Sequence, residues 1–238
     1  MAPARSELKG RAIGLLGGTF DPVHNGHLAA VRVAREELGL DGVFFIPASR
    51  PPHKPSYRVS SFEHRVAMLK AAIGESHALS VCQIEKDRPG PSYTIDTLTQ
   101  LNKELAGYRF YFIIGADAFA EIYSWKDYKD LPGQAHLVVM NRPDCGGVSV
   151  SKEILSAYFP AFAYDQSSKA WRAPGALGNI YCLEMPYVDI SSSLVRQRVA
   201  AGLDVSGLVP KVVVDYINEH ELYAAGGPQS LIGPLARS

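Results

Sequence analysis

The sequence predicts an α/β domain with a Rossmann-like, mostly parallel sheet flanked by helices, and with C-terminal helices packed against it. Short apolar runs typical of buried strands alternate with amphipathic segments of about a dozen residues, which is the pattern of repeated βαβ units. The length of 238 residues suits one domain of this kind. We expect that domain to span residues 11–223, between flexible segments at 1–10 and 224–238.

Composition narrows the classes of function. The 24 Lys and Arg residues balance the 24 Asp and Glu residues, so no overall field favours nucleic acid or an anionic membrane. No apolar run approaches the ~20 residues that span a bilayer, and residues 1–10 lack the apolar core of a secretory signal. The 3 cysteines lie far apart, which argues against a disulfide framework or a cysteine zinc site. We therefore expect a cytoplasmic protein without nucleic-acid or membrane partners; a homo-oligomer is left open.

A turn rich in glycine and histidine follows the first predicted strand, residues 12–16. It reads GGTFDPVHNGH over residues 17–27, and the apolar residues after it fall on one helical face. Glycines let backbone N–H groups approach a ligand, and a helix N-terminus carries roughly half a positive charge. A single histidine is more often structural than ligand-binding, but His24 and His27 lie together beside these donors. We interpret the turn as a cradle for nucleotide phosphate.

The remaining elements follow from the same patterns. Further strands are expected at 42–47, 78–84, 108–114, 135–140 and 179–185. Further helices are expected from Ser60 or Ser61 to Ile73, and at 92–105, 118–122, 125–131, 151–159, 190–201 and 209–223. Residues 160–178 show no clear periodicity, so they are expected to form either a lid or a disordered insertion.

Charged side chains follow several of these strands. Lys54 lies in the proline-rich loop after the second strand, Asp117 follows the fourth and Arg142 the fifth. Ligands of open parallel sheets bind outside the carboxyl ends of the strands, so this edge is the expected site, although the loop composition fits an exposed connector equally well. Arg196 lies near the start of the 190–201 helix, where the helix dipole disfavours a cation. An anionic ligand would compensate; a solvated surface arginine is the alternative.

The motifs together resemble the bacterial nicotinate-nucleotide adenylyltransferases, within the nucleotidyltransferase superfamily named for its His-x-Gly-His motif. The end motifs, GGTFDPVHNGH at 17–27 and ISSSxxR at 190–196, also occur in phosphopantetheine adenylyltransferases. The chain length and the motifs PPHK at 51–54, SYT at 92–94, GAD at 115–117 and Trp125 favour the nicotinate family. One departure is that Ser49 and Arg50 stand where the family often has an asparagine, which leaves the contacts of this loop open.

The resemblance implies transfer of the adenylyl group of ATP to nicotinate mononucleotide, giving deamido-NAD and pyrophosphate by direct in-line attack of the mononucleotide phosphate. It implies catalytic roles for His24, His27, Lys54 and Arg196. It assigns the following residues to ATP: Gly18, Thr19, Phe20, His24, His27, Gly115, Asp117, Ile190, Ser191, Ser192 and Arg196. It assigns Lys54, Tyr93, Thr94, Trp125 and Arg142 to nicotinate mononucleotide.

Two features of this implied site follow from charge. Magnesium keeps waters and binds phosphate oxygens, so Mg²⁺ is expected to be carried by the phosphates rather than by a protein cage. An aromatic face attracts the positively charged pyridine ring, the role expected of Trp125; core packing is the alternative. A nucleotide-binding sensor without turnover and a nicotinamide-specific enzyme are the other functions to be tested.

Overall fold

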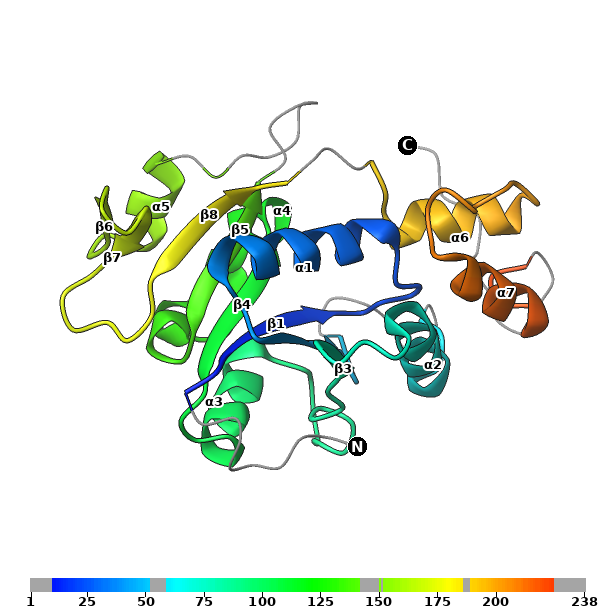
Figure 1. The fold of residues 1–238 in the computed structure, drawn as a ribbon, viewed down its shortest axis with the longest axis horizontal. Coiled ribbons are helices and arrows are strands. Elements are labelled where there is room, and N and C mark those ends of the chain that lie inside the picture. The colour runs from blue at the N-terminus through cyan, green and yellow to red at the C-terminus, as the bar shows by residue number, and fades with distance from the viewer. Residues whose placement is uncertain (1–9, 52–58, 142–149, 151, 186–188, 225–238) are drawn as a thin grey trace.

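Strand β1 (Ala12–Gly18) is an interior strand of the sheet, and its side chains alternate between two apolar cores. Ala12 and Leu16 pack into the core on one face, and Ile13 and Leu15 into the core on the other. The computed structural model describes residues 10–51, 59–141, 150, 152–185 and 189–224. Within these residues the chain forms one twisted sheet with helices on both faces (Figure 1).

The sheet has eight strands in the order β3-β2-β1-β4-β5-β8-β7-β6. The other strands are β2 (Gly42–Pro47), β3 (Leu79–Val81), β4 (Arg109–Gly115), β5 (His136–Asn141), β6 (Ala163–Asp165), β7 (Ala170–Arg172) and β8 (Ile180–Glu184). The pairings from β3 through β8 are parallel, and those of β7 with β8 and β6 are antiparallel. The strand order reverses direction between β1 and β4, which is where ligands bind in such sheets.

Two groups of helices cover the two faces. One core includes residues of α1 (Asn25–Leu38), α2 (Phe62–Ile73), α6 (Ser192–Ala200) and α7 (Lys211–Glu219). The other includes residues of α3 (Thr94–Glu104), α4 (Ala116–Ala120), η3 (Ile122–Ser124), η4 (Tyr128–Gly133) and α5 (Lys152–Tyr158). Figure 1 shows α6 and α7 together at one end of the molecule, beyond α1 and α2. The predicted α/β class, with C-terminal helices packed on the domain, is confirmed.

Helix α1 illustrates how the sequence sets an element's limits. It begins directly after the glycine and histidine turn, and its buried side chains repeat at helical spacing: Ala30, Val31 and Ala34. It ends at Gly39, whose φ of 58° is a left-handed conformation that suits glycine at a helix end. The first turn of α1 therefore lies at the edge of the sheet where β1 ends.

Residues 160–178 correct the prediction of a lid or a disordered insertion, because strands β6 and β7 extend the sheet there. The turn between them is held by Asp165, whose carboxylate accepts hydrogen bonds from the backbone N–H and hydroxyl of Ser167 and from the hydroxyl of Ser168. The buried ring of Trp171 packs into the core beside Ile180 of β8. Strands of three residues are too short for alternation to show in the sequence.

The last helix also ends earlier than predicted, at Glu219 rather than near Tyr223. Glu221 and Tyr223 have φ of 49° and 64°, which a helix does not allow. The chain turns there so that Tyr223 enters the core. The predicted flexible segments at 1–10 and 224–238 lie, apart from one residue each, outside the described residues. Among the helices described, none is long and apolar enough to cross a membrane.

Candidate active site

The turn between β1 and α1 is fixed to the core by Phe20. Phe20 has a φ of 52°, and its ring is buried against the edge of the Phe45 ring, with the centroids 5.8 Å apart. A Cβ atom on Gly18 would lie 3.0 Å from the Phe20 ring, so a side chain at this position would push against the buried ring. Gly17 is exposed and Gly18 and Thr19 are half-buried, which leaves their backbone open to a ligand.

His24 and His27 lie in direct contact at the start of α1. Their rings stack with centroids 3.6 Å apart, and a Cβ atom on Gly26 would lie 3.1 Å from Nδ1 of His24. His24 is buried, whereas His27 is partly exposed. The backbone N–H of His24 donates to Nδ1 of His27 at 3.2 Å. A ring nitrogen that accepts a hydrogen bond carries no proton, so the proton of His27 lies on Nε2.

The beginning of α6 is bonded to this turn across more than half of the chain. The hydroxyl of Ser192 donates to the carbonyl oxygen of Pro22 at 2.9 Å. Nη1 of Arg196 donates to the carbonyl oxygen of Asp21 at 2.6 Å. Ser191 caps the helix by accepting a hydrogen bond from the N–H of Leu194. The two end motifs of the sequence therefore form one surface.

Two further residues predicted to bind ATP, Gly115 and Asp117, lie one strand away. β4 pairs with β1 in parallel and ends at Gly115, so the two carboxyl ends are adjacent. A Cβ atom on Gly115 would meet no other atom within 4 Å, which shows open space above this backbone. Asp117 is exposed in the first turn of α4, directly after the strand. The site can thus extend from the histidines across β1 to Asp117.

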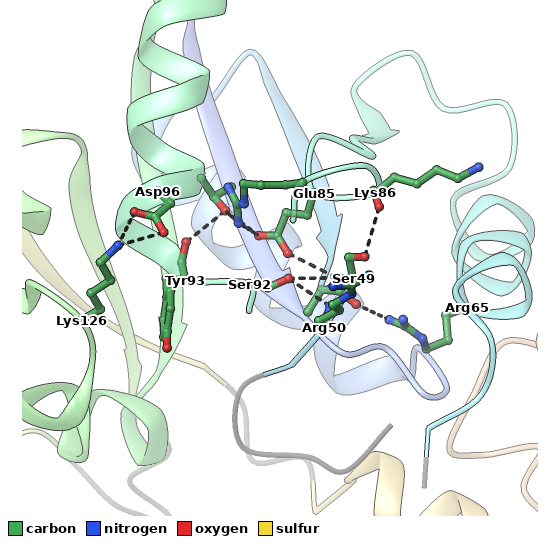
Figure 2. Close-up of polar contacts among 12 residues, drawn as sticks. Ser49, Arg50, Arg65, Glu85, Lys86, Ser92, Tyr93, Asp96 and Lys126 are labelled. Atoms are coloured by element: carbon green, nitrogen blue, oxygen red, sulfur yellow. Dashed lines mark hydrogen bonds and ion pairs between the residues drawn. The ribbon is translucent and has the colours of Figure 1, made fainter. Parts of the chain in front are cut away.

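The residues predicted to bind the pyridine ring come from two segments that a lysine joins. Trp125 is half-buried, with its ring edge-on to Phe112 of β4 at a centroid distance of 6.2 Å. Nζ of the next residue, Lys126, lies 5.2 Å from the ring centroid of Tyr93 and is 2.9 Å from a carboxylate oxygen of Asp96 (Figure 2). That hydrogen bond raises the pKa of Lys126. The segments that carry Tyr93 and Trp125 therefore lie side by side.

Thr94 lies closer to the sheet. It lines a small cavity of about 30 Å³ together with Gly17, Ile46 and Phe112, at the ends of β1 and β2. Its place as the first residue of α3 puts its backbone N–H among the donors of a helix N-terminus. Of the predicted residues for nicotinate mononucleotide, Lys54 and Arg142 lie outside the described residues.

The loop after β2 is attached to the segment before α3. The hydroxyl oxygen of Ser92 accepts hydrogen bonds from the N–H groups of Ser49 and Arg50, both at 3.1 Å, and the N–H of Ser92 donates to the carbonyl oxygen of Arg50 (Figure 2). The hydroxyl of Ser49 donates to the carbonyl oxygen of Lys86 at 3.3 Å. The two residues that depart from the family's usual pattern thus hold the loop against its neighbours.

Sequence reasoning missed a buried polar group behind the phosphate turn. The carboxylate of Asp21 is 2% exposed and accepts hydrogen bonds from the hydroxyl of Tyr223 at 2.6 Å and the N–H of Ser60 at 3.2 Å. Arg65 of α2 is also 2% exposed. A signal for Arg65 was present, because its spacing from Phe62 and Leu69 places a charged residue on the inward face of that helix.

The donors near the turn bear on the expected magnesium ion. In the ranges that the structure describes, no group of three or more His, Cys, Asp or Glu side chains is arranged to hold a metal ion. The carboxylate of Asp21, the acidic group nearest to the histidines in sequence, is engaged with Tyr223 and Ser60. The chemistry of this donor set is that of an anion site, which suits a cation that arrives on phosphate oxygens.

Comparison with known proteins gives a consistent result. A family model described as Cytidylyltransferase-like matches residues 15–198. A protein of Geobacter sulfurreducens named "Probable nicotinate-nucleotide adenylyltransferase" is 39% identical over 214 residues, which are 90% of this chain and 99% of the relative. A protein of Desulfitobacterium hafniense with the same name is 36% identical over 90% of this chain and 96% of the relative.

Solved structures show the same fold. The Plasmodium falciparum nicotinic acid mononucleotide adenylyltransferase complexed with NaAD superimposes with a TM-score of 0.69 at 21% identity. The alignment covers 90% of this chain and 97% of the Plasmodium chain. The fold of this chain is therefore one that is also seen in a solved structure.

Proposed function

This chain belongs to the nicotinate-nucleotide adenylyltransferase family, and from that premise we propose that the site described above joins its two nucleotides by direct in-line attack. The protein is a nucleotidyltransferase of NAD biosynthesis that transfers the adenylyl group of ATP to nicotinate mononucleotide, giving deamido-NAD and pyrophosphate. The proposals below concern the mechanism, the metal ion and the role of each residue.

One observation supports the placement of the triphosphate most directly. The hydrogen bonds from Ser192 to Pro22 and from Arg196 to Asp21 bring a guanidinium and a capped helix N-terminus onto the turn that carries the histidines. Three sources of positive potential then lie at one turn: the N-terminus of α1, the N-terminus of α6 and the charge of Arg196. We assign the phosphates of ATP to this turn.

The chemistry requires charge neutralisation rather than a general base. The second pKa of a phosphate monoester is near ~6, so the phosphate of the mononucleotide is already ionised at neutral pH. One of its oxygens forms a bond to the α-phosphorus of ATP as the bond from that phosphorus to the bridging oxygen breaks, and pyrophosphate leaves with the electron pair. The protein must bring two polyanions together and stabilise the charge that moves to the leaving group.

The histidines and Arg196 are suited to different parts of that task. The Nε2 proton of His27 can donate to a phosphate oxygen as a neutral hydrogen bond, since Nδ1 accepts from the backbone. His24 stacks on His27 and so fixes the plane of its ring. Arg196 adds a permanent charge, as does Lys54 by resemblance. Magnesium, when bound to the phosphates, supplies further positive charge at the leaving group.

For the acceptor, we propose that the pyridine ring lies against the half-buried face of Trp125, beside Tyr93 and the N-terminus of α3. The N–H groups at that helix end, which include that of Thr94, would attract the nicotinate carboxylate. Asp117, exposed beyond β4, is placed to accept hydrogen bonds from ribose hydroxyls. Because both substrates are intracellular nucleotides, we propose that the reaction takes place in the cytoplasm.

The test is pyrophosphate release from ATP and Mg²⁺ with nicotinate mononucleotide, nicotinamide mononucleotide or phosphopantetheine as acceptor. We expect turnover with nicotinate mononucleotide to exceed turnover with nicotinamide mononucleotide at equal concentrations. The reverse preference would identify a nicotinamide enzyme, and turnover with phosphopantetheine alone would identify the wrong acceptor. Binding of ATP without pyrophosphate release from any acceptor would indicate a sensor and overturn the proposal.

A further inference from the structure

The guanidinium of Arg65 lies where β1 and β2 separate. These strands pair in register up to Gly18 and Pro47. Nη1 of Arg65 donates to the carbonyl oxygens of the next residue on each strand, Thr19 and Ala48, both at 2.8 Å. The guanidinium therefore bridges the two segments directly beyond their last backbone hydrogen bond, which runs from the N–H of Ala48 to the carbonyl oxygen of Gly18 at 2.8 Å.

The same side chain is also bonded to the segment that precedes its own helix. Nε of Arg65 donates to the carbonyl oxygen of Ser60 at 3.0 Å, and the N–H of Ser60 donates to Asp21 in the phosphate turn. The planar, forked guanidinium thus joins three chain segments with hydrogen bonds in fixed directions. Figure 2 shows Arg65 reaching from its helix toward the loop that carries Ser49 and Arg50.

Because the guanidinium of Arg65 is buried, the loss of its hydration offsets much of what its hydrogen bonds contribute to stability. Arg65 has the largest fully buried side chain in the described part of the chain, and desolvation lowers its pKa, opposed chiefly by the charge of Asp21. Replacing buried charges by apolar side chains of similar size is often neutral or stabilising. A buried cation whose hydrogen bonds all go to backbone carbonyls is better explained by the geometry that it imposes on those carbonyls.

The two bridged segments serve different substrates in the proposed function. Thr19 belongs to the turn assigned to ATP, whereas Ala48 begins the loop that carries Lys54, assigned to the mononucleotide. In the proposed function, the separation of these two backbones bears on how far apart the two nucleotides are held. A misplacement of about 1 Å can cost ~100-fold in rate.

We propose that Arg65 is a positioning residue for adenylyl transfer, which sets the distance between the ATP turn and the mononucleotide loop through the carbonyl groups of Thr19 and Ala48. This inference rests on the proposed function. It predicts that changes at Arg65 lower kcat more than they weaken the binding of either nucleotide, because each half of the site remains intact.

The primary test compares Arg65→Lys with the wild type. Lysine keeps the charge, but its single ammonium group cannot reproduce the directed bonds to three carbonyls. We expect kcat to fall at least tenfold at saturating substrates, with the Kd for ATP and the KM for nicotinate mononucleotide within about threefold of wild type. Arg65→Gln, with a shorter planar amide, should show the same split.

Val66→Ala is the matched control, because Val66 is the next residue of the same helix and is also buried. Its side chain has no group that could form a hydrogen bond with either loop. Val66→Ala should lower Tm and leave kcat unchanged below the transition. Addition of millimolar guanidinium to Arg65→Ala, with urea at the same concentration as the comparison, should restore part of kcat.

The outcomes separate the two levels of inference. If the wild type releases no pyrophosphate, the proposed function fails, whatever Arg65 does. With an active wild type, an unchanged kcat in folded Arg65→Lys overturns the positioning role. A loss of ATP affinity equal to the loss of kcat also overturns it, because it would show a role in binding. A failure of both Arg65→Lys and Arg65→Gln to fold overturns it as well, because it would show a purely structural role.

Discussion

The hydroxyl of Tyr223 offers a sharp test of how the end of the chain stabilises the phosphate turn. Tyr223→Phe removes one oxygen atom and keeps the buried ring. It breaks the 2.6 Å hydrogen bond to the carboxylate of Asp21, which then retains the bond from the N–H of Ser60. The change removes this bond between a neutral donor and a buried charged acceptor, and with it the hydrogen bond between the Ser60 side chain and the Tyr223 oxygen.

The magnitude follows from the burial of both partners. Hydrogen bonds to charged groups contribute about 1.5–3 kcal/mol, and Asp21 is too buried for water to replace the lost donor. We expect Tyr223→Phe to lower the free energy of unfolding by about 2 kcal/mol. For a chain of this size, that loss corresponds to a fall in Tm of about 4–8 °C.

Tyr123→Phe is the control, because it removes the same atom from a side chain that is 58% exposed. Its effect on the free energy of unfolding should stay within about 0.5 kcal/mol. Urea unfolding followed by circular dichroism, together with calorimetric Tm values, measures both variants. If Tyr223→Phe and Tyr123→Phe have equal stability, the bond to Asp21 contributes nothing and the reasoning is refuted.

The stability of the wild type and that of Tyr223→Phe should depend differently on pH in the alkaline range. Burial, with the charge of Asp21 as the next cause, raises the pKa of Tyr223 above its ordinary value of 10.0. The folded state therefore holds this proton more tightly than the unfolded state. The contribution of the protonated Tyr223 to the free energy of unfolding is fully present below pH 10 and is lost as the pH rises further. The stability difference between wild type and Tyr223→Phe should shrink above pH 10, by up to about 1.4 kcal/mol per pH unit. A difference that stays constant up to pH 11 would contradict this account.

Three further predictions concern turnover. His27→Ala should lower kcat by at least tenfold, about 1.4 kcal/mol, with the fold intact by circular dichroism; a smaller fall would count against a role at the phosphates. Trp125→Ala should raise the KM for nicotinate mononucleotide by about 2- to 30-fold, the range of a cation–π contact of 0.5–2 kcal/mol, and leave the KM for ATP unchanged; an unchanged KM for the mononucleotide would refute the stack. Removal of Mg²⁺ with a chelator should abolish pyrophosphate release and added MgCl₂ should restore it; full activity in excess chelator would show that no divalent ion is needed.

The parts of the fold that could be predicted are those in which local pattern and tertiary role coincide. The central strands are continuous apolar runs because both of their faces are buried, and the turn at 17–27 is recognisable because its glycines and histidines are adjacent in sequence. The strands β6 and β7 could not be predicted, since three residues do not show a period and their pairing depends on β8. The early end of α7 was missed because the burial of Tyr223 depends on Asp21, 202 residues away.

The candidate site divides in the same way. Residues that would touch a nucleotide lie in short motifs, whereas the residues that support them are scattered. Arg65 and Glu85 each meet the loop after β2 through one hydrogen bond to a backbone group, and Ser92 meets it through bonds to the backbone of Ser49 and Arg50. Such bonds place few demands on the surrounding sequence. The exception is an inward-facing charge on a helix, which periodicity reveals, as at Arg65.

The way in which Arg196 is held has a consequence for catalysis. Its guanidinium donates to the carbonyl oxygen of Asp21 and to the hydroxyl of Ser193, while the carboxylate of Asp21 is directed to Tyr223 and Ser60. Among the residues that the structure describes, Arg196 forms no ion pair within 4.0 Å. A guanidinium that is oriented by neutral groups keeps its full charge for a ligand, whereas a carboxylate partner would cancel it. The bonds to Tyr223 and Ser60 therefore keep the carboxylate of Asp21 away from the site where two polyanions must meet. The backbone carbonyl of Asp21, in turn, orients the guanidinium of Arg196 toward that site.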